Sequence, residues 1–97
     1  FENQYRLWYY KSMKPIWMKK AKKYYDESPK TFRGRVDRAL EELIGIFPDV
    51  EKSPNVKMMQ GTDDIYRYRV GDFRILFAVI GETLYIVEIG SRGDIYK

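Results

Sequence analysis

Residues 66–90 read YRYRVGDFRILFAVIGETLYIVEIG, and this stretch decides the fold. It holds runs of β-branched and aromatic residues separated by two Gly-X dipeptides. A two-residue loop that begins with glycine is typical of a type II′ hairpin, because glycine readily takes the positive φ of its first position. The sequence therefore predicts an antiparallel meander. Its expected strands are Tyr66–Val70, Phe73–Ile80 and Thr83–Gly90, joined at Gly71-Asp72 and Gly81-Glu82.

Upstream of residue 48 the apolar period is helical. Pro15 suits a first helical turn, and we expect a helix over Ile16–Tyr25. Ser28-Pro29 pairs an N-cap residue with proline at the first helical position. From Phe32 to Phe47 apolar residues recur every three or four positions, which predicts a second, amphipathic helix.

The chain begins with a further strand candidate, Gln4–Tyr10, which is rich in aromatic residues. Residues 48–62 hold two prolines and Gly61 and are expected to form a loop. The fold class that follows is α+β in the order β-α-α-β-β-β, an antiparallel sheet with a helical hairpin packed on one face. At 97 residues we expect one domain, 1–97.

The amino-acid composition excludes several kinds of catalytic and metal-binding site. The chain has neither cysteine nor histidine, so thiolate nucleophiles, disulfides and the commonest metal ligand and acid–base group are absent. We therefore expect no metal and no small-molecule cofactor. No apolar run approaches the roughly 20 residues that span a bilayer, and no signal peptide is visible, so we expect a cytoplasmic protein without a membrane partner. The net charge of +4 is compatible with an acidic or nucleic-acid partner.

Three arginines in the predicted meander are the candidate site. If the first hairpin is a simple two-residue turn, Arg69 lies opposite Arg74, and Arg67 points the same way as Arg69. Like charges placed opposite each other destabilise a sheet, whereas an anion that bridges them relieves the repulsion. The alternative is that these arginines are solvated strand residues paired with Asp63, Asp64, Asp72 or Glu88. A one-residue bulge in the turn would move Arg74 away from the other two.

Two other surfaces are candidates for binding. Lysines 19, 20 and 23 lie on the first predicted helix, in a segment without acids, and form a possible phosphate-binding surface; a solvated helix face is the alternative. On the sheet face that carries the arginines, regular alternation also places an apolar patch of Leu76, Ala78, Tyr85, Val87 and Ile89. With the helices on the other face, this patch predicts a partner site, unless the loop at 48–62 or the first strand covers it.

The pattern of residues 59–97 closely resembles the RelE/ParE superfamily of type II toxin–antitoxin toxins. The resemblance is carried by Met59-Gln60-Gly61, by the run 66–77, by Gly90-Ser91-Arg92 and by Asp94-Ile95-Tyr96. It implies a toxin that cuts messenger RNA on the ribosome and is held inactive by a cognate antitoxin. With an antitoxin as the partner, the apolar patch at Leu76, Ala78, Val87 and Ile89 is the surface that we expect it to bind.

The resemblance also implies a set of working residues. Carried over by position, the catalytic residues are Arg67, Arg69, Arg74, Arg92 and Tyr96. The implied reaction is attack of a ribose 2′-hydroxyl on the adjacent phosphate. The arginines would stabilise charge and Tyr96 would stack on or orient a base. Some members have lysines where this chain has Arg67 and Arg69, and arginine is a poor general base. Either Arg69 acts purely by electrostatics, a lysine such as Lys57 supplies the base, or catalysis is slow; Lys57 is also a candidate for RNA binding.

Two other functions compete with this prediction. A ParE-like toxin inhibits DNA gyrase by binding and needs no catalytic residues. A plain RNA-binding module would keep RNA affinity without cutting. The arginine and tyrosine series favours the ribonuclease.

Overall fold

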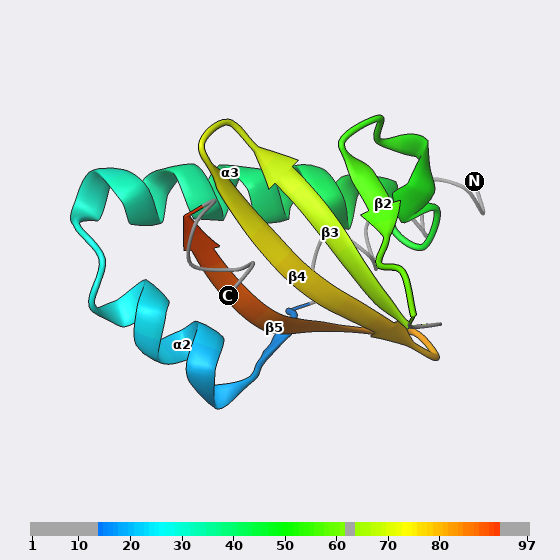
Figure 1. Cartoon of the computed structure of the whole chain (residues 1–97), viewed down its shortest axis with the longest axis horizontal. Helices are drawn as coiled ribbons and strands as arrows, with labels where there is room; N and C mark the ends of the chain where they lie inside the picture. Colours follow the sequence, from blue (N-terminus) through cyan, green and yellow to red (C-terminus); the bar gives the residue numbers. More distant parts are fainter. Residues whose placement is uncertain (1–13, 62–63, 92–97) are drawn as a thin grey trace, which may run out of the picture.

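The structure is a computed structural model that describes residues 14–61 and 64–91 (Figure 1). The predicted strand at Gln4–Tyr10 lies outside these residues. The elements are β1 (Ile16–Trp17), α2 (Lys19–Asp26), α3 (Lys30–Ile46), a 3-10 turn (Val50–Lys52), β2 (Val56–Met58), β3 (Ile65–Val70), β4 (Phe73–Ile80) and β5 (Thr83–Ser91).

The strands form one five-stranded sheet in the order β1-β5-β4-β3-β2 (Figure 1). β2 to β5 are antiparallel neighbours, whereas β1 runs parallel to β5. The α+β class and the order of two helices before the three-stranded meander are confirmed. The sheet is mixed, not purely antiparallel, and the segment expected to be a loop contains the short strand β2.

Both hairpin loops are confirmed as two-residue turns. Gly71 and Gly81 have φ values of 58° and 65°, and no described residue other than glycine has a positive φ. A positive φ at the first loop position alone identifies type II′, since type I′ needs it at both. The turn length fixes the β3–β4 register, which places Val70 opposite Phe73.

The first predicted helix begins three residues later than expected. Ile16 and Trp17 extend along β5 instead, and the Met18 N–H continues that ladder by donating to the Ile86 carbonyl at 2.9 Å. Satisfying backbone groups at this sheet edge outweighs the helix-starting preference of Pro15. Ser28 is also not a cap: its hydroxyl donates to the Tyr24 carbonyl at 2.6 Å, and α3 starts after Pro29.

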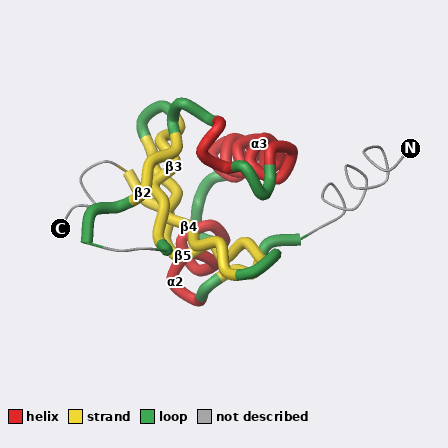
Figure 2. The backbone as a smooth tube through the Cα atoms, turned by 90° about the vertical axis from the view of Figure 1, so that its right-hand side faces the viewer, coloured by secondary structure: helices red, strands yellow, loops and turns green. Residues whose placement is uncertain are grey.

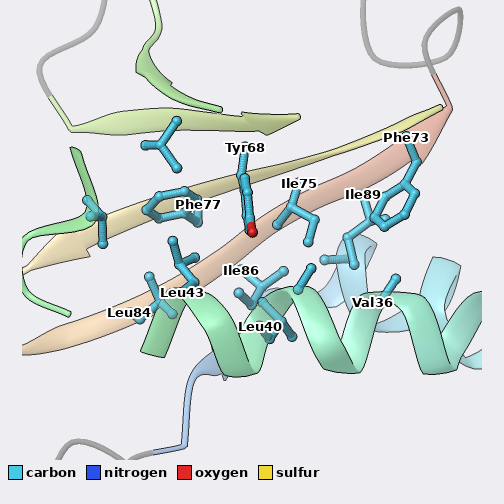
Figure 3. Packing of buried hydrophobic residues seen from close by; sticks show 14 of the residues in the cluster. Val36, Leu40, Leu43, Tyr68, Phe73, Ile75, Phe77, Leu84, Ile86 and Ile89 are labelled. Atoms are coloured by element: carbon cyan, nitrogen blue, oxygen red, sulfur yellow. The ribbon is translucent and has the colours of Figure 1, made fainter. Parts of the chain in front are cut away.

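The core lies between the sheet and α3, which stands on one side of the strands (Figure 2). α3 buries one stripe at helical spacing, and β4 and β5 bury alternate residues against it (Figure 3). The main contributors are Val36, Leu40, Leu43, Phe73, Ile75, Phe77, Leu84 and Ile86. α2 runs beside β5 and buries Ala21 fully. Together the helices cover one face and one edge of the sheet, and the arginines lie on the other face.

Candidate functional site

The β3–β4 register brings the predicted arginines onto one face. Arg69 lies opposite Arg74, and Arg67 lies opposite Leu76. Between them, Tyr68 is buried on the α3 side and pairs with Ile75 (Figure 3). Since successive side chains of a strand alternate, the arginines share the opposite face. The predicted convergence of like charges is therefore present.

Strand β2 adds a fourth cation to this face. Lys57 lies opposite Arg67, while its neighbour Val56 pairs with buried Tyr68. The Arg69 N–H donates to the Asn55 carbonyl at 3.0 Å, which extends the β2–β3 contact. We call Lys57, Arg67, Arg69 and Arg74 the cationic face. A depression of about 450 Å³ opens beside it, lined by Lys57, Met58, Met59, Gln60 and Arg67.

The members of the cationic face differ in exposure. Lys57 and Arg69 are exposed and Arg67 is half-buried, whereas Arg74 is only 2% exposed. Arg67 and Arg74 also take part in interactions within the chain. The open part of the site is therefore the β2–β3 side, and Arg74 forms its closed end. Arg92 and Tyr96 lie outside the described residues.

Two of the carboxylates named as possible partners for the arginines, Asp72 and Glu88, form ion pairs with other cations. Asp72 accepts from Arg35 of α3 at 2.8 Å, and this contact lowers the pKa of the Asp72 carboxyl. Glu88 pairs with Lys20 of α2 at 3.3 Å. Arg35 also lies over the Phe73 ring, 5.0 Å from its centre, and so holds α3 to the hairpin that carries Arg69 and Arg74.

A β-bulge in β5 corrects the predicted composition of this face. The register passes from Leu76 opposite Glu88 to Phe77 opposite Ile86, which leaves Val87 without a partner on β4. Beyond the bulge the alternation is reversed. Ile89 therefore pairs with Ile75 in the core, not in the outer patch, and Glu88 takes the outward position.

The predicted open apolar patch is also not observed. Leu76 and Ala78 do face away from α3, but they are 9% and 4% exposed, and Val87 is half-buried. With Ile89 on the opposite face, the structure offers no continuous exposed apolar surface at these residues.

The predicted lysine surface is only partly connected to the site. Lys19 and Lys23 are exposed on α2, which packs against β5 and not against the strands β2 and β3 that carry Lys57, Arg67 and Arg69. Lys20 reaches the cationic face through its ion pair with Glu88, which offsets its charge. Lys57 is the predicted RNA-binding lysine that the sheet places directly beside an arginine.

On the α3 side, tyrosines of β3 pair with carboxylates of other elements. The Tyr68 hydroxyl donates to Glu42 at 3.1 Å, and burial together with this carboxylate raises the pKa of Tyr68 to about 12. The Tyr66 hydroxyl donates to Glu51 at 3.1 Å, and burial raises its pKa as well. These contacts fix β3 from behind, so that Arg67 and Arg69 are held on the other side.

Residues 14–61 and 64–91 contain no group of three or more His, Cys, Asp or Glu residues that could hold a metal ion. They also contain no helix long and apolar enough to cross a membrane.

Comparison with known proteins assigns this fold and charge pattern to a class of toxins. The model for the ParE toxin of the type II toxin–antitoxin system parDE matches residues 16–96. The chain therefore belongs to the ParE toxin family, within the RelE/ParE superfamily of type II toxin–antitoxin toxins.

Relatives on the RelE side are equally evident. The toxin RelE1 of Methanocaldococcus jannaschii is 29% identical to this chain over 62 residues. The match covers 62% of this chain and 69% of RelE1. The RelB-RelE antitoxin–toxin complex from Methanococcus jannaschii matches with a TM-score of 0.68 at 26% identity, covering 84% of this chain and 95% of that one. The RelE-RelB complex from Pyrococcus horikoshii matches with a TM-score of 0.63 at 26% identity, covering 84% and 98%.

Proposed function

We propose that this toxin is an endoribonuclease that cuts messenger RNA on the ribosome, by attack of a ribose 2′-hydroxyl on the adjacent phosphate. The observation that carries the proposal is the cross-strand register, which gathers Lys57, Arg67, Arg69 and Arg74 on one sheet face. Like charges on neighbouring strands destabilise a sheet unless an anion bridges them. A chain of phosphates is such an anion, and the planar guanidinium group suits it.

The exposed and buried members of the cationic face would have different roles in binding RNA and in stabilising charge. Lys57, Arg67 and Arg69 lie on the open side and would hold the RNA backbone. Arg74 is buried, so it would add positive potential from the closed end of the site. Arg92 and Tyr96 complete the proposed set by resemblance alone, as a transition-state arginine and a base-stacking tyrosine.

A cognate antitoxin is the proposed protein partner. Two solved relatives with 26% identity are antitoxin–toxin complexes, RelB-RelE and RelE-RelB. Ile89 of the predicted antitoxin-binding patch lies in the core, so it would not contribute to that surface.

The second candidate function is non-catalytic inhibition of DNA gyrase, and the match to the ParE family model favours it. The two candidates make opposite demands on the cationic face. A ribonuclease needs these cations at the scissile phosphate, whereas an inhibitor that acts by binding needs no reacting group.

The test compares wild-type toxin with two arginine variants in parallel assays. One assay follows mRNA cleavage in a ribosome-containing extract, and the other follows supercoiling by gyrase. Arg69→Gln removes an exposed cation of the face, and Arg38→Gln removes an exposed cation of α3 as the matched control. We expect cleavage by wild type and Arg38→Gln, a loss of about tenfold or more in Arg69→Gln, and no effect on gyrase. Gyrase inhibition without cleavage would reject the ribonuclease.

A further inference from the structure

We propose that Glu88 is the general base of the cleavage reaction, an inference that rests on the proposed function. The reaction needs a group that accepts the proton of the attacking 2′-hydroxyl. The chain has no histidine or cysteine, and arginine cannot be deprotonated in a protein. The base must therefore come from a carboxylate, a lysine or a tyrosine.

The β5 bulge places a carboxylate on the cationic face. Glu88 lies opposite Leu76, which lies opposite Arg67, which lies opposite Lys57. These residues form one row across four strands, with Glu88 and Lys57 at its ends. Among the described residues of β2 to β5, Glu88 is the only carboxylate in a paired position on this face.

Glu88 is also close to the arginine at the closed end of the site. Arg74 pairs with Gly90, two residues from Glu88 on the same face. Diagonal neighbours of this kind have Cα atoms about 7–8 Å apart, within reach of two long side chains. A phosphate held by Arg67 on the open side of the site would have Glu88 farther along the same row and Arg74 next along β4.

The Glu88 carboxylate is accessible to solvent and is held in place by a neighbouring side chain, and both properties suit a reacting group. The Glu88 side chain is 22% exposed, so RNA can reach it, and Lys20 holds its carboxylate at 3.3 Å from α2. Among residues 14–61 and 64–91, Lys20 of α2 contacts its carboxylate, and the register places Arg74 of β4 and Tyr85 of β5 on the same face.

Glu88 and Lys57, at the two ends of this row, can carry out both proton transfers that the cleavage reaction requires. The Glu88 carboxylate takes the proton from the 2′-hydroxyl, whose oxygen forms a bond to phosphorus with its own electron pair. The bond from phosphorus to the 5′-oxygen breaks, and its electron pair leaves with that oxygen. Lys57, at the opposite end of the row, supplies the proton that the 5′-oxygen takes up. The products are a 2′,3′-cyclic phosphate and a free 5′-hydroxyl, and Glu88 returns its proton to Lys57 through solvent.

The experiment separates catalysis from binding, because the charge effect alone has the opposite sign. Glu88→Gln removes a negative charge from a phosphate-binding face. If Glu88 has no catalytic role, this change strengthens RNA binding and leaves cleavage equal or faster. We expect instead that single-turnover cleavage falls about 100-fold or more, the usual contribution of a positioned base. Affinity for an RNA with a 2′-deoxy scissile nucleotide should stay equal or rise.

Glu82→Gln is the matched control, because Glu82 is exposed in the β4–β5 turn, away from the row. It should cut at the wild-type rate. Glu88→Asp keeps the charge but withdraws the carboxylate by one methylene, and should cut at a rate between wild type and Glu88→Gln. It also provides the test should the glutamine variant fail to fold.

The outcomes are distinguishable. Wild-type toxin that cuts no RNA rejects the proposed function. Wild-type toxin that cuts while folded Glu88→Gln or Glu88→Asp cuts as fast rejects only the role of Glu88. An RNA with a 5′-thio leaving group, which needs no acid, should be cut slowly by Glu88→Gln. Restored cleavage of that substrate would make Glu88 the acid and overturn its assignment as base.

Discussion

Neutralising Arg69 should make the domain more stable while making it a poorer toxin. Arg69 is exposed and lies directly opposite Arg74, which is 2% exposed, so two positive charges face each other across the β3–β4 ladder. Two unit charges about 7 Å apart repel by about 0.6 kcal/mol in water, and more where one is shielded from solvent. Directly opposed like charges in sheets cost a similar amount, about 0.2–1 kcal/mol.

We therefore expect Arg69→Gln to raise the free energy of unfolding by about 0.5–1 kcal/mol. For a domain of this size that corresponds to a rise in Tm of about 2–6 °C. Thermal unfolding followed by circular dichroism at low ionic strength measures it. The gain should shrink in molar salt, where charges are screened beyond about 3 Å. Added phosphate should raise the Tm of wild type more than that of the variant, because an anion relieves the same repulsion.

Arg38→Gln serves as the control, since it removes the same charge from an exposed position of α3. Arginine and glutamine have similar helix propensities, so its Tm should not rise. An Arg69→Gln protein that melts at or below the wild-type temperature would refute the claim that the cationic face is strained without its ligand. The argument for a polyanion partner would then lose its physical basis.

Further predictions concern the support behind the site. Tyr68→Phe should cost about 1 kcal/mol, because the hydrogen bond to Glu42 is lost. The Tyr68 hydroxyl stabilises the fold fully below pH 10, and this stabilisation is lost as the pH rises through the folded pKa of about 12; the difference between wild type and Tyr68→Phe in alkaline urea unfolding isolates the loss. Gly71→Ala should destabilise by about 1–2 kcal/mol, since φ is 58° there. Gly45→Ala, in α3 with open space around it, should stabilise by about 0.5–1 kcal/mol in the same assay.

The sequence predicted the β3–β4 pairing because a two-residue loop leaves one register. Gly71 and Asp72 connect the strands with no spare residue, so the position of Arg69 opposite Arg74 follows from counting. The two short strands were missed for a different reason. β1 has two residues and β2 has three, too few to show a period of two, and both form because an existing strand offers them a ladder.

The β5 bulge was missed although the sequence carries a signal for it. Regular alternation from Leu84 and Ile86 would continue to Glu88 and bury its carboxylate against the helices. An isolated buried carboxylate is very costly, whereas one extra residue at Val87 turns Glu88 outward and Ile89 into the core. The free-energy cost of burying the Glu88 carboxylate therefore predicts the bulge at Val87, which regular alternation of side chains does not.

The same bulge connects the stability of the fold to the chemistry proposed for it. The core gains Ile89, which is 2% exposed, and the outer face gains a carboxylate in a row with Arg67 and Lys57. The Glu88 carboxylate also pairs with Lys20 and so ties the outer face of β5 to α2. The cationic face has a second use for a carboxylate there, since its arginines can hold a phosphate but cannot accept a proton. Packing explains why residue 88 faces outward, and the proposed reaction gives its carboxylate a role beyond the ion pair with Lys20.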